Sequence, residues 1–313
     1  MKRIKKLLSL LLSLTLVFSL AACGSSSDSG DAEKADKKTS ESSEAVLKIG
    51  AIPDQSAEEL NENMGKMAEY LSEKTGLKVE YVPSQDYAAL VTAFERGEMH
   101  LAWFGGLTGV QAMNVVSGAE AIAQRPMDAQ FHSVFIAQKG LDIAGLEDLK
   151  GKSFTFGSES STSGHLMPRY FLGEAGINPD ADFDGEPNFS GSHDKTYALV
   201  ESGAFQAGAL NESVWKKAVE EGKVDTSKVD VFYTTPDYFD YNWTINSEEV
   251  LSEQFGEGTK EKVADVLLNM GADSENETAK AVLAFFQTDS FIETANENYS
   301  MIEKIAKELG MVK

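Results

Sequence analysis

From Val46 onward, the chain alternates short apolar segments with longer segments in which apolar residues recur every three or four positions. The short segments have the composition of buried strands, and the longer ones have the period of helices with one apolar face. We predict strands at 46–52, 77–82, 100–104, 133–138 and 152–156. We predict helices at 60–75, 87–96, 106–112, 146–150, 165–173, 259–270, 278–286 and 299–309.

Glycine and proline mark where these elements end. Pro53 and Pro83 follow predicted strands, Gly76 closes the first helix, and Gly105-Gly106 separates a strand from the helix after it. Strands that alternate with helices predict an α/β architecture with helices on both faces of a sheet. Ligands of such sheets bind beyond the carboxyl ends of the strands, where loops run into helix N-termini.

The N-terminus has the pattern of a bacterial lipoprotein signal. Four basic residues precede the apolar run Leu7–Leu20, and Leu20-Ala21-Ala22-Cys23-Gly24 then has the form of a lipobox. The run is too short to cross a hydrocarbon core about 30 Å thick as a helix. We predict a signal peptide over 1–22, a lipid on the Cys23 thiol that holds the chain at the outer side of the cell membrane, and a flexible polar tether over 23–45. The alternative is an ordinary secreted protein with a chance cysteine.

Charge and cysteine content narrow the choice of partners. The chain has 313 residues, one cysteine and a formal charge of −22, which loss of the four basic residues in the signal would lower to −26. Such an acidic surface argues against nucleic acid as a partner and favours solubility. With its cysteine used for a lipid, the fold must rely on its core rather than on disulfides. An anionic ligand would have to be attracted by a local site and not by the overall field.

The segment with the clearest chemistry is the turn Ser161-Thr162-Ser163, which we call the serine turn. It precedes the predicted helix 165–173, so unpaired backbone N–H groups and the positive end of the helix dipole would face outward there. Such a turn can hold an oxyanion without lysine or arginine. The other interpretation is plain capping of the helix by serine or threonine, and the residues alone do not separate the two.

Four motifs that follow one another in the chain together resemble a known family. They are Ala102-Trp103-Phe104-Gly105-Gly106-Leu107-Thr108, Ser161-Thr162-Ser163-Gly164, Gly191-Ser192-His193-Asp194 and Pro236-Asp237-Tyr238-Phe239-Asp240-Tyr241-Asn242-Trp243. In this order they resemble the phosphate, phosphite and phosphonate substrate-binding proteins of ABC importers, the PhnD-type family, over about residues 47–270. The last motif and the run that begins at Gly105 are most similar to members labelled as phosphite or selenate binders.

The resemblance implies a fold class and a role. The fold is α/β of the periplasmic-binding-protein type 2, with two α/β lobes joined by a two-strand hinge and a ligand cleft between them. Residues 46–133 and 241–313 would form lobe 1, and residues 134–240 would form lobe 2. The role is that of an extracytoplasmic lipoprotein that captures a small phosphorus oxyanion or phosphonate and delivers it to the permease of an ABC importer. It would act as a monomer without a cofactor.

The resemblance also implies which side chains contact the ligand. Those that match the family's motifs are Tyr87, Ser161, Thr162, Ser163, His193 and Asp240. Gly105, Gly106 and Thr108 would contribute a loop from lobe 1, and Tyr241 would line the cleft. Where phosphonate-binding relatives carry aromatic residues, this chain has Gln130-Phe131-His132-Ser133, which leaves the ligand open. His132 is either a further ligand contact or a surface histidine at the start of a strand.

His193 and Asp240 have distinct chemical roles in this hypothesis. His193 could donate a hydrogen bond to an anionic oxygen, and its charge would respond to modest changes of environment near neutral pH. A carboxylate at Asp240 repels an oxyanion unless the ligand carries a proton or an amine. Asp240 would therefore select protonated oxyanions or aminophosphonates over fully ionised selenate or sulfate.

Two functions of other classes use the same residues. Ser161, His193 and Asp240 could form a hydrolytic triad, but the serine lacks the Gly-x-Ser-x-Gly elbow. Alternatively, Asp240 and nearby aromatic residues could bind an organic cation or an amino acid. The histidines show no spacing that indicates a metal site, so none is expected.

Overall fold

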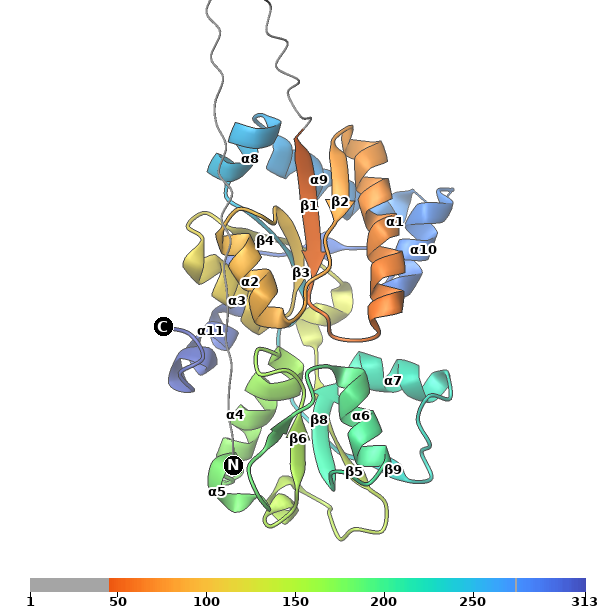
Figure 1. The fold of residues 1–313 in the computed structure, drawn as a ribbon, viewed down its shortest axis with the longest axis vertical. Coiled ribbons are helices and arrows are strands. Elements are labelled where there is room, and N and C mark those ends of the chain that lie inside the picture. The colour runs from red at the N-terminus through yellow and green to blue at the C-terminus, as the bar shows by residue number, and fades with distance from the viewer. Residues whose placement is uncertain (1–44, 274) are drawn as a thin grey trace, which may run out of the picture. The chain divides into compact units, whose positions relative to one another are not determined.

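A computed structural model describes residues 45–273 and 275–313. The predicted signal peptide, Cys23 and all but the last residue of the predicted tether lie outside the described residues. None of the helices in the described part of the chain combines the length and the apolar character needed to span a bilayer. The described residues form two sheets, each with helices packed around it (Figure 1).

The sheet of lobe 1 has six strands in the order β11-β4-β10-β3-β1-β2. Strand β1 lies parallel to β2 and β3, whereas β10 returns from late in the chain and runs antiparallel between β3 and β4. Strand β11 pairs antiparallel with β4 at the edge. The strands are β1 (Val46–Ala51), β2 (Lys78–Tyr81), β3 (Leu101–Phe104), β4 (Glu120–Gln124), β10 (Asn242–Ile245) and β11 (Ile292–Glu293).

The sheet of lobe 2 has five strands in the order β7-β6-β8-β5-β9. Strand β8 is central, and β5 lies between β8 and β9 and runs antiparallel to both, while β6 lies parallel to β7 and β8. The strands are β5 (Ser133–Gln138), β6 (Phe154–Phe156), β7 (Asn188–Phe189), β8 (Ala207–Asn211) and β9 (Val229–Thr234).

The helices divide between the two sheets in the same way (Figure 1). Around the first sheet lie α1 (Ala57–Thr75), α2 (Tyr87–Glu95), α3 (Gly106–Val115), α8 (Glu248–Phe255), α9 (Thr259–Asn269), α10 (Glu277–Phe285) and α11 (Ser300–Glu308). Around the second lie α4 (Met167–Glu174), α5 (Pro179–Asp182), α6 (His193–Glu201) and α7 (Glu212–Glu220). Short tight turns occur at η1 (Pro126–Gln130), η2 (Leu146–Leu149), η3 (Thr162–Leu166), η4 (Met270–Ala272) and η5 (Asn296–Tyr299).

Most of the periodic segments are confirmed to within two residues at the ends of strands and three at the ends of helices. Helix α1 ends where Gly76 adopts φ 71°, as the glycine signal predicts. Two predicted α-helices are different in form: 146–149 is a 3₁₀ turn, and the segment expected at 165–173 begins earlier, with a π-helical turn at 162–166. The second case matters because Thr162 and Ser163 become the first helical residues, with Ser161 as the cap that precedes them.

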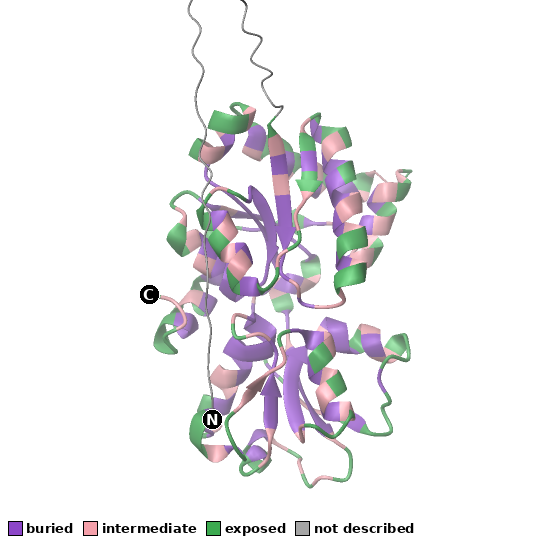
Figure 2. Cartoon of the chain, viewed as in Figure 1, coloured by how far each residue is buried: buried purple, intermediate pink, exposed green. Residues whose placement is uncertain are grey.

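Apolar side chains from both faces of each sheet form the cores. The largest cluster belongs to lobe 1 and contains the strands β1 and β3 together with buried faces of α1 and α10. Lobe 2 has two smaller clusters on the two faces of its sheet, one around Phe135 and Phe154 and one around Ile136 and Leu210. Figure 2 shows the inner strands of both sheets as largely buried and the outer faces of the helices as exposed. Each lobe therefore has its own hydrophobic core, although the exact limits of the lobes stay predictions.

Two chain segments cross between the sheets and form the hinge. Phe131 and Tyr238 exchange backbone hydrogen bonds of 2.8 and 3.0 Å, and Thr235 donates its N–H to the Ser133 carbonyl at 3.0 Å. Asp240 also donates its N–H to the Asp128 carbonyl at 3.0 Å. The crossings are thus paired with each other along their length, so the lobes are expected to move about one joint.

A buried ion pair lies at the lobe 1 end of this hinge. Arg125 Nε and Nη2 donate to the two carboxylate oxygens of Asp128 at 2.7 and 2.6 Å, and Arg125 Nη1 donates to the Phe286 carbonyl at 3.1 Å. The Arg125 side chain is 6% exposed and that of Asp128 is fully buried. The guanidinium also lies within 6 Å of three aromatic ring centres, those of Trp103, Phe131 and Tyr241.

We expect Asp128→Ala to lower the free energy of unfolding by about 3–5 kcal/mol, because it leaves a buried arginine without its counter-charge. Urea denaturation measures the loss. The matched control is Asp180→Ala, which removes the partner of Arg169, also held by two hydrogen bonds but with the carboxylate side chain 63% exposed. That change should cost less than about 1 kcal/mol. Equal losses for the two variants would contradict the assignment of Arg125 and Asp128 as a hinge-fixing pair.

Candidate functional site

The N-terminus of α3 supplies the lobe 1 wall of the candidate site. Strand β3 ends at Phe104, and the next backbone amides point toward the hinge and lobe 2. Gly106 N–H donates to Asp240 Oδ1, and Leu107 N–H donates to Thr162 Oγ1, both at 2.9 Å. Since Asp240 belongs to the hinge and Thr162 to lobe 2, the first turn of α3 is capped by groups from outside its own lobe.

Close approach of the lobes here depends on the absence of a side chain at Gly105. A Cβ at this position would lie 3.0 Å from Thr162 Oγ1 and 3.2 Å from Asp240 Oδ1. Thr108 closes the same turn from within, because its hydroxyl oxygen accepts the Gly105 N–H at 3.1 Å. Gly105, Gly106 and Thr108 therefore lie at the predicted place, but the Gly106 amide and the Thr108 hydroxyl are used inside the protein. Direct ligand contact by these three residues stays a prediction.

The serine turn supplies the opposite wall. Ser161 Oγ accepts the Gly164 N–H at 3.0 Å, which makes Ser161 the cap of the π-helical turn. Gly164 in turn packs so tightly that a Cβ would lie 3.0 Å from the Gly157 Cα. Because Thr162 and Ser163 are the first helical residues, their amides have no intrahelical acceptor. The capping interpretation is confirmed, since Ser161 caps the helix. That the amides of the following residues hold an oxyanion stays a prediction.

Tyr87 and Asp240 complete the walls with two buried ionisable groups. Tyr87 is the first residue of α2, which starts because the Asp86 carboxylate accepts the Ala89 N–H at 2.7 Å. Burial raises the pKa of the Tyr87 phenol well above its usual value, so the phenol is neutral and can donate. Burial raises the pKa of Asp240 to about 7, opposed by the Gly106 N–H and the Thr162 side chain. At neutral pH a substantial fraction of Asp240 is therefore protonated.

Three side-chain oxygens of this region are buried without a well-formed hydrogen bond to any described residue. They are Tyr87 Oη from lobe 1, Ser163 Oγ from lobe 2 and Asp240 Oδ2 from the hinge. The Ser161 side chain lies close enough to Tyr87 to oppose the rise in the phenol's pKa, but the pair lacks the geometry of a hydrogen bond. Buried polar atoms are almost always paired in native proteins, so these three unpaired oxygens are candidates for contact with a polar ligand.

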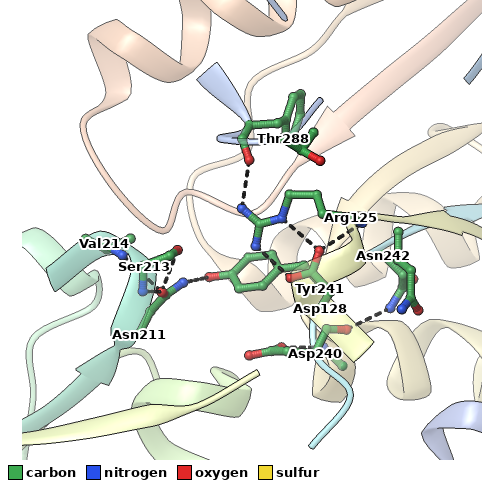
Figure 3. Close-up of polar contacts among 12 residues, drawn as sticks. Arg125, Asp128, Asn211, Ser213, Val214, Asp240, Tyr241, Asn242 and Thr288 are labelled. Carbon is green, nitrogen blue, oxygen red and sulfur yellow. Dashed lines mark hydrogen bonds and ion pairs between the residues drawn. The ribbon is translucent and has the colours of Figure 1, made fainter. Parts of the chain in front are cut away.

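A second polar network crosses between the lobes through Tyr241, and Figure 3 shows its contact with Asn211. Tyr241 donates its hydroxyl to Asp54 Oδ2 at 2.8 Å and accepts from Asn211 Nδ2 at 3.0 Å. The backbone N–H of His193 donates to the Asp54 carbonyl at 2.9 Å. Asp54 follows β1 in lobe 1, whereas Asn211 and His193 belong to lobe 2. Burial raises the pKa of Asp54 to about 6, opposed first by the Tyr241 hydrogen bond and then by Arg125.

His193 is neutral in this network, which corrects one expectation from the sequence. It is fully buried, and burial lowers its pKa to about 4. Its charge therefore does not respond near neutral pH. Its Nδ1 accepts the Asn211 N–H at 3.3 Å, so the ring proton is on Nε2, which contacts Tyr241 Oη at a long 3.4 Å. The Nε2–H of His193 is thus available as a donor, but the imidazole does not change its charge near neutral pH, contrary to the prediction.

Asp54 and Asn211 are the members of this network that the sequence analysis missed. Each is the first polar residue beyond, or at, the carboxyl end of a strand, where ligands of α/β proteins bind. That position is the signal that could have found them. His132, by contrast, is singled out by the sequence but has a partner within the protein. Its Nδ1 lies 2.8 Å from the Thr235 carbonyl of the other hinge segment. Its contact with a ligand stays a prediction.

The geometry also bears on the other chemistries considered. In a hydrolytic triad the histidine Nδ1 is held by a carboxylate, whereas His193 Nδ1 accepts a backbone N–H and Asp240 Oδ1 accepts the Gly106 N–H. Among residues 45–273 and 275–313, no group of three or more histidine, cysteine or acidic side chains could hold a metal ion. That no metal or cofactor is needed stays a prediction.

Two α/β lobes, a hinge of two paired segments and polar groups that meet between the lobes define a solute-binding protein of the periplasmic-binding-protein type 2 class. The structure matches that of a protein from Prochlorococcus marinus in complex with methylphosphonate, with a TM-score of 0.82, 41% identity, and 86% of this chain and 99% of that chain covered. The chain belongs to the family of periplasmic substrate-binding proteins of phosphonate ABC transporters, whose model matches residues 49–299.

Two characterised relatives differ in the ligand that their names give. A probable phosphite-binding protein of an ABC transporter from Prochlorococcus marinus is 41% identical over 274 residues, which cover 86% of this chain and 91% of the relative. A phosphate-import protein from Mycolicibacterium smegmatis is 30% identical over 206 residues, which cover 61% of this chain and 63% of the relative. The homologues are thus substrate-binding components of importers that act outside the cytoplasm.

The raised pKa of Asp240 predicts a pH-dependent cost of folding. Because its pKa is about 7 in the folded chain and near 3.8 when unfolded, the folded state binds more protons between about pH 4 and 7. The contribution of Asp240 to stability therefore falls as pH rises through that window and is constant above it. Asp240→Asn keeps an oxygen for the Gly106 N–H but cannot ionise. Its stability relative to the natural protein should increase by up to about 1.4 kcal/mol per pH unit from pH 5 to 7.

Urea denaturation of both proteins at pH 5, 6, 7 and 8 measures this difference, in which the titration of all other groups cancels. The measurement at pH 8 is the internal control, because the difference should grow little once Asp240 is ionised in both the folded and the unfolded chain. A difference that is constant from pH 5 to 8 would show that burial does not raise the pKa of Asp240.

Proposed function

We propose that the cleft of this protein binds a small phosphorus oxyanion or phosphonate in a singly protonated form and that the closed complex is handed to the permease of an ABC importer. The observation that carries the proposal is the set of Tyr87 Oη, Ser163 Oγ and Asp240 Oδ2, three buried oxygens from two lobes and the hinge that make no well-formed hydrogen bond to any described residue. A ligand that bonds to all three links both halves of the protein.

The cluster favours a tetrahedral oxyanion because donors outnumber acceptors. Tyr87 and Ser163 can donate their hydroxyl protons, and so can Ser161, whose oxygen already accepts an N–H. The amides at the start of the helical turn and the Nε2–H of His193, which is held only by a long contact, add donors from lobe 2. No lysine or arginine is required, because hydrogen bonds to a charged ligand are about twice as strong as neutral ones.

Asp240 gives this site its selectivity. A carboxyl with a pKa near 7 can accept a hydrogen bond from a P–O–H group when ionised, or donate one when protonated. Phosphite, phosphate and methylphosphonate carry such a titratable oxygen near neutral pH, whereas sulfate and selenate do not. Selenate, the alternative ligand, would place a full double charge against Asp240.

Lobe closure tells the permease that a ligand is bound. The ligand contacts both lobes only when they are together, so it stabilises the closed form by the difference in its affinity for the two forms. The permease then recognises the closed surface. In this proposal the protein works as a monomer held at the membrane and delivers its ligand to the permease of an ABC importer, the kind of transporter that its family serves.

The proposed ligand class is tested by calorimetric titration with phosphite, methylphosphonate, aminoethylphosphonate, phosphate, sulfate and selenate. We expect at least one phosphorus ligand to bind and sulfate and selenate to bind at least a hundredfold more weakly. Ser163→Ala should weaken binding by about ten- to a hundredfold, since it removes one hydrogen bond to a charged ligand. Its stability should change by less than about 1 kcal/mol, because Ser163 Oγ makes no well-formed hydrogen bond to a described residue, although it lies close enough to Tyr238 to lower the pKa of that phenol.

Ser202→Ala is the control, because Ser202 lies exposed at the end of α6 and only contacts the Leu199 carbonyl. It should leave binding as it is. Equal affinity for sulfate and phosphite, or unchanged binding by Ser163→Ala, would contradict the proposed site.

The lipid anchor is a separate part of the proposal and rests on the motif around Cys23, the one cysteine of the chain. With its thiol acylated, the mature chain would remain with membranes after cell lysis, and Cys23→Ser would release it to the soluble fraction. Fractionation followed by immunoblotting measures this. A natural chain found only in the soluble fraction would rule out the anchor but leave ligand binding unaffected.

A further inference from the structure

An ion-pair cluster spans the two lobes at a place separate from the ligand cluster. Glu59 lies in the first turn of α1 in lobe 1. Its carboxylate receives hydrogen bonds from Lys217 Nζ at 3.0 Å and Lys223 Nζ at 2.8 Å, and both lysines belong to lobe 2. Lys217 is part of α7, and Lys223 follows that helix. Figure 1 shows the start of α1 directed toward the lobe that carries α7.

The two lysines also contact an acidic residue of their own lobe, and one of them contacts a second helix of lobe 1. Glu221 also pairs with both, at 3.9 Å from Lys217 and 2.8 Å from Lys223. Lys217 Nζ lies 5.9 Å from the ring centre of Phe285 at the end of α10, another lobe 1 helix. These groups enclose a cavity of about 360 Å³ that is also lined by Asp194 and Tyr197.

We propose that Glu59, Lys217 and Lys223 form an interlobe clasp, which is made only when the lobes close and which retards their opening. The contacts of Glu59 join the lobes, so they cannot survive a separation that carries α1 away from α7. The contacts of Glu221 lie within lobe 2 and persist. In the closed form the two lysines therefore contact two carboxylates, those of Glu59 and Glu221. In the open form they contact only that of Glu221.

The clasp gives the lysines a second role in the open form. On a strongly acidic chain, an anion approaching the cleft meets a repulsive field, and any local positive charge raises its rate of arrival. When opening carries Glu59 away, the positive charges of Lys217 and Lys223 are less neutralised than they are in the closed form. They then lie at the edge of the cleft that the anion approaches. This inference rests on the proposed function, since it assumes an anionic ligand that is enclosed by lobe closure.

The clasp is partly exposed, so its effect is modest and depends on salt. The side chains of Glu59, Lys217 and Lys223 are 36%, 23% and 44% exposed. Exposed ion pairs change an equilibrium by about two- to fivefold each, and screening weakens them at high ionic strength. An energetic link of this size would alter how long the ligand is held without deciding whether it binds.

The test is stopped-flow kinetics with methylphosphonate, using the intrinsic fluorescence of the protein. Glu59→Gln should accelerate dissociation by about three- to tenfold in 20 mM salt and by less in 500 mM salt, with association unchanged or faster. Lys223→Gln should also accelerate dissociation but should slow association, because it removes an attracting charge. Glu69→Gln, which removes the same charge from an exposed position of α1, is the matched control.

Identical dissociation rates for Glu59→Gln and Glu69→Gln would overturn the clasp. A double-mutant cycle of Glu59→Gln and Lys223→Gln on the ligand dissociation rate should be non-additive by about two- to fivefold, because the clasp is made in the closed, liganded form. If the natural protein bound sulfate or selenate and no phosphorus ligand, the proposed function would fail, and the same cycle with that anion would still decide on the clasp. Strict additivity in the cycle would show that the two residues do not interact.

Discussion

The closed arrangement depends on the contact between the first turn of α3 and two oxygens from outside its lobe. Gly106 and Leu107 have amides that no helical carbonyl can satisfy, and Asp240 and Thr162 accept them at 2.9 Å. Asp240 thereby has one oxygen fixed by the protein and the other buried without a hydrogen bond to a described residue. The same junction caps a helix, joins the lobes and holds a buried acidic group, so none of these properties can change independently.

The junction explains how a strongly acidic protein can bind an anion. Burial of Asp240 and Asp54 raises the pKa of both carboxyls, and burial of His193 keeps the imidazole neutral. The cleft is therefore less charged than the chain's composition indicates, and neutral donors dominate it. The buried arginine nearby is matched by Asp128 and serves the hinge rather than the ligand.

Local periodicity accounts for what the sequence could predict. Strands such as β5 and helices such as α1 follow from the spacing of apolar residues and from glycine at their ends, and the serine turn follows from its position before a helix. The partners of Asp54 could not be predicted in this way, because a single aspartate after a strand has no period and its contacts come from residues more than 130 positions away. The neutrality of His193 likewise depends on burial, which only the assembled lobes create.

The polar contacts between the lobes differ in how far they are exposed to water. Because burial changes the strength of a polar contact, the buried and the exposed contacts have different roles. The bonds of Asp54, Thr162 and Asp240 are buried, where a hydrogen bond is strong and an unpaired group is costly, so they define the geometry of closure. The bonds of Glu59 are partly exposed to water, where each contributes little and responds to salt. A binding protein must close on its ligand and also release it to the permease. Strong, directional contacts inside and weak, adjustable ones at the edge of the cleft meet both requirements, because the edge can open without first breaking the contacts that hold the ligand.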